Sequence, residues 1–164
     1  MPDNLHPLVY RFIEDAGNTT QSFGVGRVIG QIYAFLYFSP SPETLDGMRD
    51  GLGISKGSAS IAVRQLEQWG AVQKVWVKGD RKDYYTAKDA FGKIIKNAIL
   101  EMVGKKMGDY ESLLAEAREQ LESGAIEDDA DRIAFMQERL EHLQKFQRWS
   151  HQLWNSPMLQ TLLK

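Results

Sequence analysis

The residues from Ser55 to Gln65 combine hydroxyl, amide and cationic side chains at helical spacing. Ser55 can accept a hydrogen bond from an amide of the first helical turn, and Gly70 can end the helix in a left-handed conformation. Apolar residues at spacings of three and four are expected to face the core: Ala59, Ala62, Val63 and Leu66. The opposite side then presents Lys56, Gly57, Ser58, Ser60, Ile61, Arg64 and Gln65.

Each of these residue types has a physical reason to contact duplex DNA. The serine hydroxyls and the first-turn amides lie at the positive end of a helix, where phosphate binds well. Gly57 lets the backbone approach closely. Arg64 can hydrogen-bond guanine or phosphate, Gln65 can pair with adenine, and Ile61 offers an apolar surface to a thymine methyl group. We therefore expect this helix to enter the major groove.

A basic hairpin is predicted directly after this helix. Residues 71–78 alternate with β-branched side chains, Gly79 and Asp80 supply a turn, and residues 82–86 return as a second strand. The cations around this turn are Lys78, Arg81 and Lys82. We expect them to contact phosphate groups or the minor groove. A lysine-rich hairpin is also a common device of exposed sheet edges, so the pattern alone leaves both interpretations open.

These groups need helices to position them. A short helix over residues 44–52, the tight turn at residues 53–55 and the polar helix together form a helix-turn-helix, followed by a wing. Upstream, we predict one helix over residues 5–16 that Gly17 ends, and another over residues 22–37 that the following prolines stop.

The whole pattern predicts a fold that is mainly α with a small β-hairpin wing. Downstream we predict a helix from Lys88 to about Glu122, a break near Ser123-Gly124, a helix from about Asp129 to Trp154, and a short tail after Pro157. The fold class is a winged helix-turn-helix with additional N- and C-terminal dimerisation helices. Its parts are residues 1–38 for support and dimerisation, residues 39–88 for DNA binding, and residues 89–164 as a C-terminal helical dimerisation region.

The composition excludes several classes of function. The 164 residues are 43% hydrophobic and 26% charged, as in folded globular proteins, and they include no Cys. Disulfides, thiolate metal sites and Cys nucleophiles are therefore excluded. The net charge of −2 is uneven, because residues 55–88 carry about +4 whereas residues 101–141 are rich in acids. Such a division suits a protein that meets phosphate with one face only.

The sequence shows neither an export signal nor a membrane span. The first residues include an acid and prolines where a signal would carry basic and then apolar residues. The apolar segment 25–38 is interrupted by Arg27, Gly30 and Gln31, which makes it too short and too polar to cross a bilayer. We expect a cytoplasmic protein without a membrane partner.

We expect no catalytic or metal-binding constellation. The histidines, His6, His142 and His151, lie off the spacing that brings ligands to one helical face. No hydroxyl nucleophile stands in a catalytic setting, so we predict neither enzyme activity nor a cofactor. The glycines at 24, 26 and 30 only superficially suggest a dinucleotide-binding loop, because no strand precedes them. Close helix packing explains them better.

Two copies of the chain are expected to act together, because one winged helix reads only a few base pairs. This requirement predicts a homodimer on a palindromic duplex operator. The candidate dimerisation residues lie on apolar stripes of helices: Tyr33, Tyr37, Ile133, Met136, Leu140, Leu143, Phe146, Trp149 and Leu153. The same stripes could instead close the core of each subunit.

The run from Gly26 to Ala87 resembles the GbsR branch of the MarR-type winged-helix regulators, above all in the pieces ISKGSAS, LEQWGAV and VWVKGDRKDYY. The resemblance implies a dimeric transcriptional regulator, which we expect to be a repressor. It implies DNA contacts at Ser55, Lys56, Gly57, Ser58, Ser60, Arg64, Arg81 and Lys82. The chain departs from the family pattern at Gly47 and Gly51, where a stiffer helix is expected.

The resemblance also suggests a small-molecule effector, with a small cation such as choline as a precedent, because aromatic faces attract quaternary ammonium groups. The rings available for such a cage are Tyr10, Tyr33, Tyr37, Trp149 and Trp154. Aromatic residues at helical spacing more often belong to the core, so the sequence does not define the residues that bind an effector.

The alternative function is that of a winged-helix module which binds another protein in a larger assembly, without specific DNA binding. A salt titration separates the two functions, because DNA binding loses affinity along a straight log–log line whose slope reflects the number of phosphate contacts.

Overall fold

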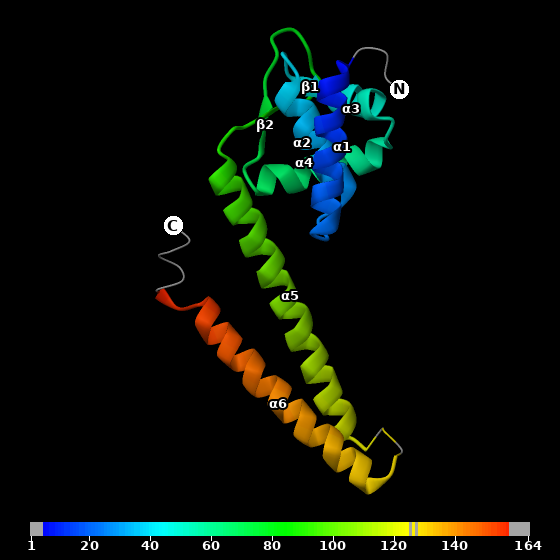
Figure 1. Ribbon diagram of the computed structural model, residues 1–164, viewed down its shortest axis with the longest axis vertical. Coiled ribbons are helices and arrows are strands. Elements are labelled where there is room, and N and C mark those ends of the chain that lie inside the picture. The colour runs from blue at the N-terminus through cyan, green and yellow to red at the C-terminus, as the bar shows by residue number, and fades with distance from the viewer. Residues whose placement is uncertain (1–4, 125, 127, 158–164) are drawn as a thin grey trace. The chain divides into compact units, whose positions relative to one another are not determined.

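The structure of the protein is a computed structural model that describes residues 5–124, 126 and 128–157 (Figure 1). The chain divides into two compact units, Met1–Ala98 and Ile99–Lys164. The described residues form six helices and one small sheet, which confirms the predicted fold class. No helix among these residues has both the length and the apolar character that a membrane span requires.

The helix α2 (Arg27–Phe38) is the centre of the first unit. It contacts α1 (Pro7–Ser22), α3 (Leu45–Leu52), α4 (Lys56–Gln68) and strand β3 (Tyr84–Ala87). These elements share one apolar core, whose fully buried side chains include Ile13, Ile32, Met48 and Val63. Because full burial of one such side chain contributes about 1.5–3 kcal/mol, this core gives α4 a fixed place on the unit.

The predicted end of the first helix at Gly17 is wrong, because α1 continues through this residue to Ser22. Gly17 is buried at the contact with α2, where a Cβ atom would lie 2.8 Å from Cγ of Gln31. At Gly30 of α2, a Cβ atom would lie 2.1 Å from the carbonyl oxygen of Ala16. Both glycines therefore serve close packing of α1 against α2, as was predicted for Gly30.

A turn at residues 23–26 separates the first two helices, so the second helix begins at Arg27 and not at residue 22 as predicted. Gly24 and Gly26 have φ angles of +73° and +106°, which favour glycine, and an added Cβ atom would meet nothing within 4 Å, so close packing was the wrong explanation for these two glycines. Thr20 fastens this turn, because its Oγ1 donates a hydrogen bond to the carbonyl oxygen of Gly26 at 2.9 Å.

The predicted wing is an antiparallel hairpin, and a third strand joins it. Strand β2 (Val72–Val75) pairs with β3, so that Val75 lies opposite Tyr84. Both strands are shorter than predicted. Strand β1 (Glu43–Thr44), which the sequence did not predict, pairs with the other edge of β3 and gives the order β1-β3-β2. Since β1 leads directly into α3, the wing and the helix-turn-helix form one body.

The helix α5 (Phe91–Glu122) begins in the first unit. Ile94 and Ala98 pack against the core of that unit. Asn97 Nδ2 donates a hydrogen bond to the carbonyl oxygen of Trp69 at 2.9 Å, at the C-terminal end of α4. The first turns of α5 are therefore fixed to the core of the first unit and to the C-terminal end of α4.

The second unit consists of the rest of α5 and the helix α6 (Ala130–Trp154). Gly124, with a φ angle of +69°, lies in the connection between them, so the predicted break near Ser123-Gly124 is confirmed. Within this unit Leu114 of α5 is buried, whereas no residue of α6 is buried along the described helix. The tail predicted after Pro157 lies outside the described residues.

Candidate nucleic-acid interface

The polar helix α4 begins at a tight turn held by hydrogen bonds. Gly53 ends α3 in a left-handed conformation with a φ angle of +65°. Ser55 is the N-cap, as predicted, and its Oγ accepts a hydrogen bond from the amide of Ser58 at 3.0 Å. The two serine hydroxyls also lie 2.8 Å apart. The amides of Lys56 and Gly57 are then the first-turn donors that a phosphate group would meet.

The two faces of α4 lie as predicted. The core side is fully covered and consists of Ala59, Ala62, Val63 and Leu66. The outer side consists of the exposed residues Lys56, Gly57, Ile61 and Arg64 and the half-buried residues Ser58, Ser60 and Gln65. The surface that we expect to read DNA therefore faces solvent in the first unit, and the role of each residue on it remains a prediction.

Packing within the first unit does not explain the residue type at two positions of this outer face, Gly57 and Ile61. A Cβ atom at Gly57 would meet only Oγ of Ser55, at 3.8 Å, so packing among the described residues does not require glycine. Ile61 is 64% exposed, although burial would favour its apolar side chain. Arg64 lies beside them and donates from Nε to the carbonyl oxygen of Ser60 at 3.3 Å, which uses one of its five donors.

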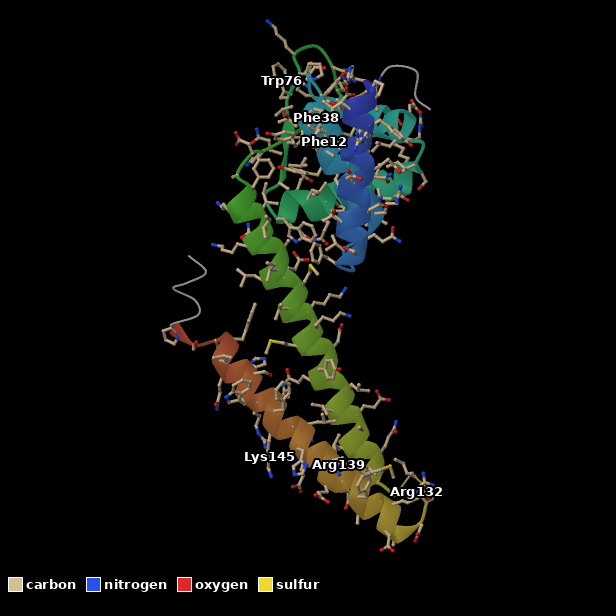
Figure 2. All side chains as sticks on the ribbon, in the orientation of Figure 1. Phe12, Phe38, Trp76, Arg132, Arg139 and Lys145 are labelled. Atoms are coloured by element: carbon tan, nitrogen blue, oxygen red, sulfur yellow. The ribbon has the colours of Figure 1, made fainter. Side chains whose placement is uncertain are left out.

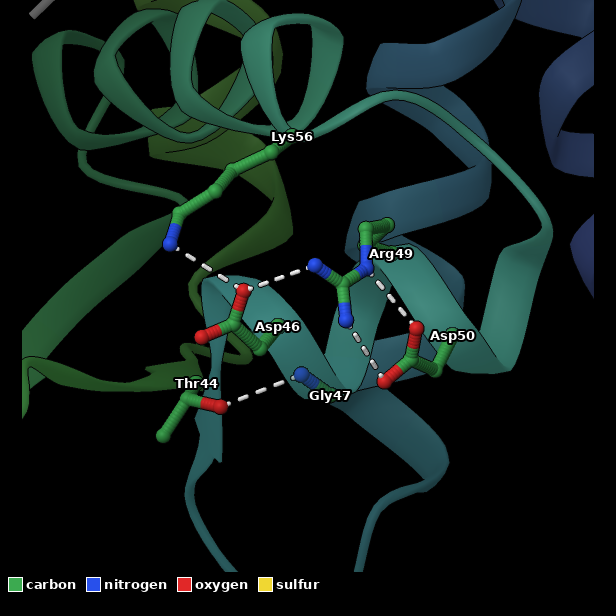
Figure 3. A network of polar contacts seen from close by, with 6 residues as sticks. All are labelled: Thr44, Asp46, Gly47, Arg49, Asp50 and Lys56. Atoms are coloured by element: carbon green, nitrogen blue, oxygen red, sulfur yellow. Dashed lines mark hydrogen bonds and ion pairs between the residues drawn. The ribbon is translucent and has the colours of Figure 1, made fainter.

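Lys56 is not free in solvent but pairs with an acid of the preceding helix (Figure 3). Its Nζ lies 3.1 Å from Oδ1 of Asp46, and Nη1 of Arg49 lies 3.2 Å from the same oxygen. Arg49 also binds Asp50, with 2.8 Å between Nε and Oδ1. The hydrogen bond from Lys56, with further help from the charges of Arg49 and Lys82, lowers the pKa of Asp46 below its usual value.

Two carboxylates of the wing, Asp80 and Asp83, hold its turn through hydrogen bonds and an ion pair. Asp80 accepts hydrogen bonds from the amide of Lys82 at 2.9 Å and from the hydroxyl of Tyr84 at 2.8 Å, and these bonds lower its pKa. Asp83 pairs with Lys74 at 2.6 Å. The predicted contact residues Lys78, Arg81 and Lys82 are exposed. None of them forms an ion pair within the described part of the chain.

Two residues near this surface were missed by the sequence analysis. Asp46 stands in the first turn of α3, where an acid is usual at a helix N-terminus, so its contact with Lys56 could not be singled out. Trp76 is 79% exposed and follows strand β2. The alternation of Lys74, Trp76 and Lys78 with valines between them could have predicted that Trp76 is exposed together with the two lysines.

The candidate dimerisation residues divide between the two units. Tyr33 is half-buried and donates its hydroxyl to the carbonyl oxygen of Lys88 at 2.7 Å, while Tyr37 is exposed. On α6 the half-buried members are Ile133, Met136 and Leu140, and the exposed members are Leu143, Phe146, Trp149 and Leu153. The rings of Phe146 and Trp149 lie 5.9 Å apart. The aromatic cage stays a prediction, since its rings are also divided between the units.

An exposed aromatic surface covers one side of the first unit. Phe12 contacts Phe38 with 5.1 Å between ring centroids (Figure 2), and Phe38 contacts Tyr37 at 5.4 Å. Tyr37 in turn contacts Phe91 at 5.5 Å. Phe12, Tyr37, Phe38 and Phe91 each keep between 40% and 49% of their surface exposed. Contiguous apolar surface of this kind marks an interaction site more often than scattered single residues do.

Metal binding has no support in the part of the chain that is described, where no group of three or more His, Cys, Asp and Glu side chains is placed to hold an ion. The carboxylates near α4 and the wing, Asp46, Asp80 and Asp83, are instead engaged in the ion pairs and hydrogen bonds given above.

The arrangement of α3, the turn at residues 53–55, α4 and the hairpin β2–β3 defines a winged helix-turn-helix domain. A solved structure described as a transcriptional regulator shares this fold, with a TM-score of 0.55 over 96% of this chain and 100% of that chain, at 19% identity.

Sequence comparisons point to one group of proteins with such a domain. The chain is 28% identical over 119 residues to the HTH-type transcriptional repressor GbsR of Bacillus subtilis (strain 168). The aligned region covers 73% of this chain and 66% of that protein. It is 32% identical to the HTH-type regulators YvaV and OpcR of the same organism, over 45% and 44% of this chain. The chain is thus GbsR-like, which confirms the resemblance seen in the sequence.

The match to these relatives is partial. The chain spans 42%, 66% and 40% of the lengths of YvaV, GbsR and OpcR. No model of a known protein family matches the chain. The relatives are named as regulators and not as enzymes.

Proposed function

We propose that the chain is a sequence-specific regulator of transcription, a repressor, that binds a palindromic duplex operator as a homodimer. The observation that carries this proposal is the outer face of α4, which is polar, exposed and held in one body with a cationic wing. A helix presented in this way fits the major groove, and the wing then reaches the neighbouring backbone. The names of the relatives support the same function.

The proposed DNA contacts are the residues predicted from the sequence. Their positions suggest which of them bind phosphate groups and which bind bases. The amides of Lys56 and Gly57 and the cations of the wing suit phosphate groups. Ile61, Arg64 and Gln65 lie further along α4 and suit base edges. The proposal places the protein in the cytoplasm, where it has access to DNA, and it allows a small-molecule effector without assigning residues to it.

The homodimer is supported by apolar surface that the chain itself leaves uncovered. On α6 the side chains of Leu143, Phe146 and Trp149 are between 51% and 63% exposed. An isolated pair of long helices with so little burial has little to hold it in place. A second copy of the chain would cover these residues, and the aromatic surface of the first unit is another candidate for the same contact. Residues 1–38 and 89–164 are the proposed dimerisation regions on this view.

The test is a salt titration of binding to duplex DNA. Operator sequence is first selected from random duplexes, and the affinity is then measured by fluorescence anisotropy between low and moderate salt. We expect a straight log–log dependence, and the double variant Arg81→Ala/Lys82→Ala should reduce its slope by about 4, because a bound dimer loses two cations from each of its two wings. The selected sequences should be palindromes if two copies bind together.

A matched control removes the same charge elsewhere. Arg132 and Lys145 lie on α6 (Figure 2) and pair only weakly with Asp128 and Glu141, at 3.5 Å and 4.0 Å. The variant Arg132→Ala/Lys145→Ala should keep the slope of the wild type. An equal reduction of the slope in both double variants would mean that the total charge of the protein, and not the wing, determines the affinity for DNA. An affinity for duplex DNA that ignores salt would favour the alternative of a protein-binding winged helix.

A further inference from the structure

Trp76 stands apart from every other large apolar residue of the described chain. It is 79% exposed, the highest value in that group, and it projects from the wing (Figure 2). Trp69 of the same domain is 6% exposed and belongs to the core. Nothing in the folding of the first unit therefore requires an indole at position 76, since the core is complete without it.

The indole lies on the cationic side of the wing. Val75 and Val77 are half-buried, whereas Lys74, Trp76 and Lys78 are exposed. Trp76 directly follows β2, and the exposed residues on either side of it in this alternation are both lysines. Trp76 also lines a hollow on the wing together with Arg81 and Lys82, among other residues.

Two acids, Asp80 and Asp83, also line this hollow, but its three cations, Lys74, Arg81 and Lys82, outnumber them. Asp83 is engaged by Lys74 at 2.6 Å, and Asp80 accepts from the amide of Lys82 and the hydroxyl of Tyr84. Arg81 and Lys82, which form no ion pair among the described residues, face solvent together with a large apolar ring. A partner that fits must offer dense negative charge and flat or apolar surface within a few ångströms of each other.

We propose that Trp76 is a DNA contact of the wing, which packs its ring against the sugars or an unstacked base step of the minor groove while the neighbouring cations hold phosphates. This inference rests on the proposed function. Duplex DNA supplies both chemistries at this spacing, and apolar wedges and aromatic rings are used in this way by other DNA-binding surfaces. Contact between the wings of two copies fits less well, because it would bring like charges together.

The inference predicts a change in affinity without a change in salt dependence. Trp76→Ala should weaken binding to the selected duplex about tenfold, because the aromatic contact with the DNA is lost. The log–log slope should stay that of the wild type, since no cation is removed. Trp76→Phe should retain most of the affinity.

Direct contact is read by fluorine NMR of protein labelled with 5-fluorotryptophan. The chain has four Trp residues, and the spectrum of Trp76→Phe identifies the resonance of Trp76. Addition of duplex should shift this resonance and leave that of the buried Trp69 nearly unchanged. Unfolding curves of each variant establish that the fold is intact.

Three results would overturn the inference. Equal affinity of wild type and Trp76→Ala for the duplex defeats the role of Trp76 and leaves the proposed function standing. A Trp76 resonance that responds to protein concentration and not to DNA makes the residue a self-association contact. A wild-type protein that binds no duplex defeats the proposed function, and the role of Trp76 with it.

Discussion

The ring of Phe35 in α2 lies directly against Gly51 in α3, so that a Cβ atom on Gly51 would come within 2.6 Å of Cε2 and 2.8 Å of Cζ. Phe35 is itself 8% exposed and belongs to the core. The glycine that weakens α3 as an isolated helix therefore lets this helix dock closely on α2.

This contact predicts opposite outcomes for the two glycines of α3. Gly51→Ala should lower the free energy of unfolding by about 1–3 kcal/mol, because the ring is enclosed and cannot move away cheaply. Gly47→Ala would meet Oε2 of Glu43, the end of a flexible side chain, and should be close to neutral or slightly stabilising. Chemical denaturation of both variants makes the comparison. Equal destabilisation would show that Phe35 does not limit the approach of α3.

The pair formed by Lys56 and Asp46 predicts competition with DNA. Asp46→Asn releases Lys56 and removes a negative charge near the proposed interface, so duplex affinity at low salt should rise about fivefold. Asp50→Asn makes the same charge change on the same helix, where the carboxylate pairs with Arg49 instead, and should have the smaller effect. Weaker binding by Asp46→Asn would mean that Asp46 orients Lys56 for its contact.

The same pair predicts a change in titration. Hydrogen bonding by Lys56 lowers the pKa of Asp46 in the folded protein. The contribution of the pair to stability is therefore fully present above the ordinary carboxyl pKa of about 3.9 and is lost as pH falls through the lowered value. In Lys56→Ala the pKa of Asp46, followed by NMR of its carboxyl carbon, should rise towards the ordinary value. An unmoved titration curve would remove Lys56 as its main cause.

Gly57 predicts a separation of stability from binding. Gly57→Ala should raise the free energy of unfolding by about 0.5–1 kcal/mol, because alanine favours the helix and its methyl group meets nothing closer than 3.8 Å. The same methyl group should hinder close approach of a phosphate to the start of α4 and weaken duplex binding. Thermal unfolding and anisotropy measure the two effects. Unchanged binding would remove the backbone at Gly57 from the interface.

Tyr33 predicts a loss of stability in alkali. Burial, with smaller effects from Tyr37 and Asp89, raises its pKa to about 12. Because the folded state favours the neutral phenol, this contribution is complete below about pH 10 and is lost as pH rises towards 12. Denaturant unfolding of the wild type should therefore weaken more steeply over this interval than that of Tyr33→Phe. The same pH dependence of the free energy of unfolding in both proteins would contradict a raised pKa of Tyr33.

The exposed side of α6 predicts the site of association. Leu143→Glu with Phe146→Glu places two charges on uncovered apolar surface, so sedimentation should show monomers if the proposed dimer uses this face. Leu140 is a poorer choice, because it is half-buried within its own unit. His142→Glu adds a charge at an exposed neighbouring position and is the control. A dimer that survives the double change would move the contact to the aromatic surface of the first unit.

Local chemistry explains which features the sequence predicted well. Ser55 caps α4 by accepting a hydrogen bond from an amide three residues away. Gly70 follows the C-terminal end of α4 in a left-handed conformation with a φ angle of +71°. The core side of α4 also follows from the helical period alone. Each of these depends on neighbours within about one or two turns, so residue types and spacing suffice to determine them.

Tertiary structure decided the features that join distant residues. Gly17 looked like a helix end, but its contact with α2 keeps it inside α1. Glu43 enters a strand only because Tyr85 lies opposite. The sequence by itself thus determined the helices, the hairpin and the polar face of α4, since these follow from short-range hydrogen bonds and periodicity. The close helix contacts, the third strand and the pairing of Lys56 with Asp46 arose from packing, which no local pattern encodes.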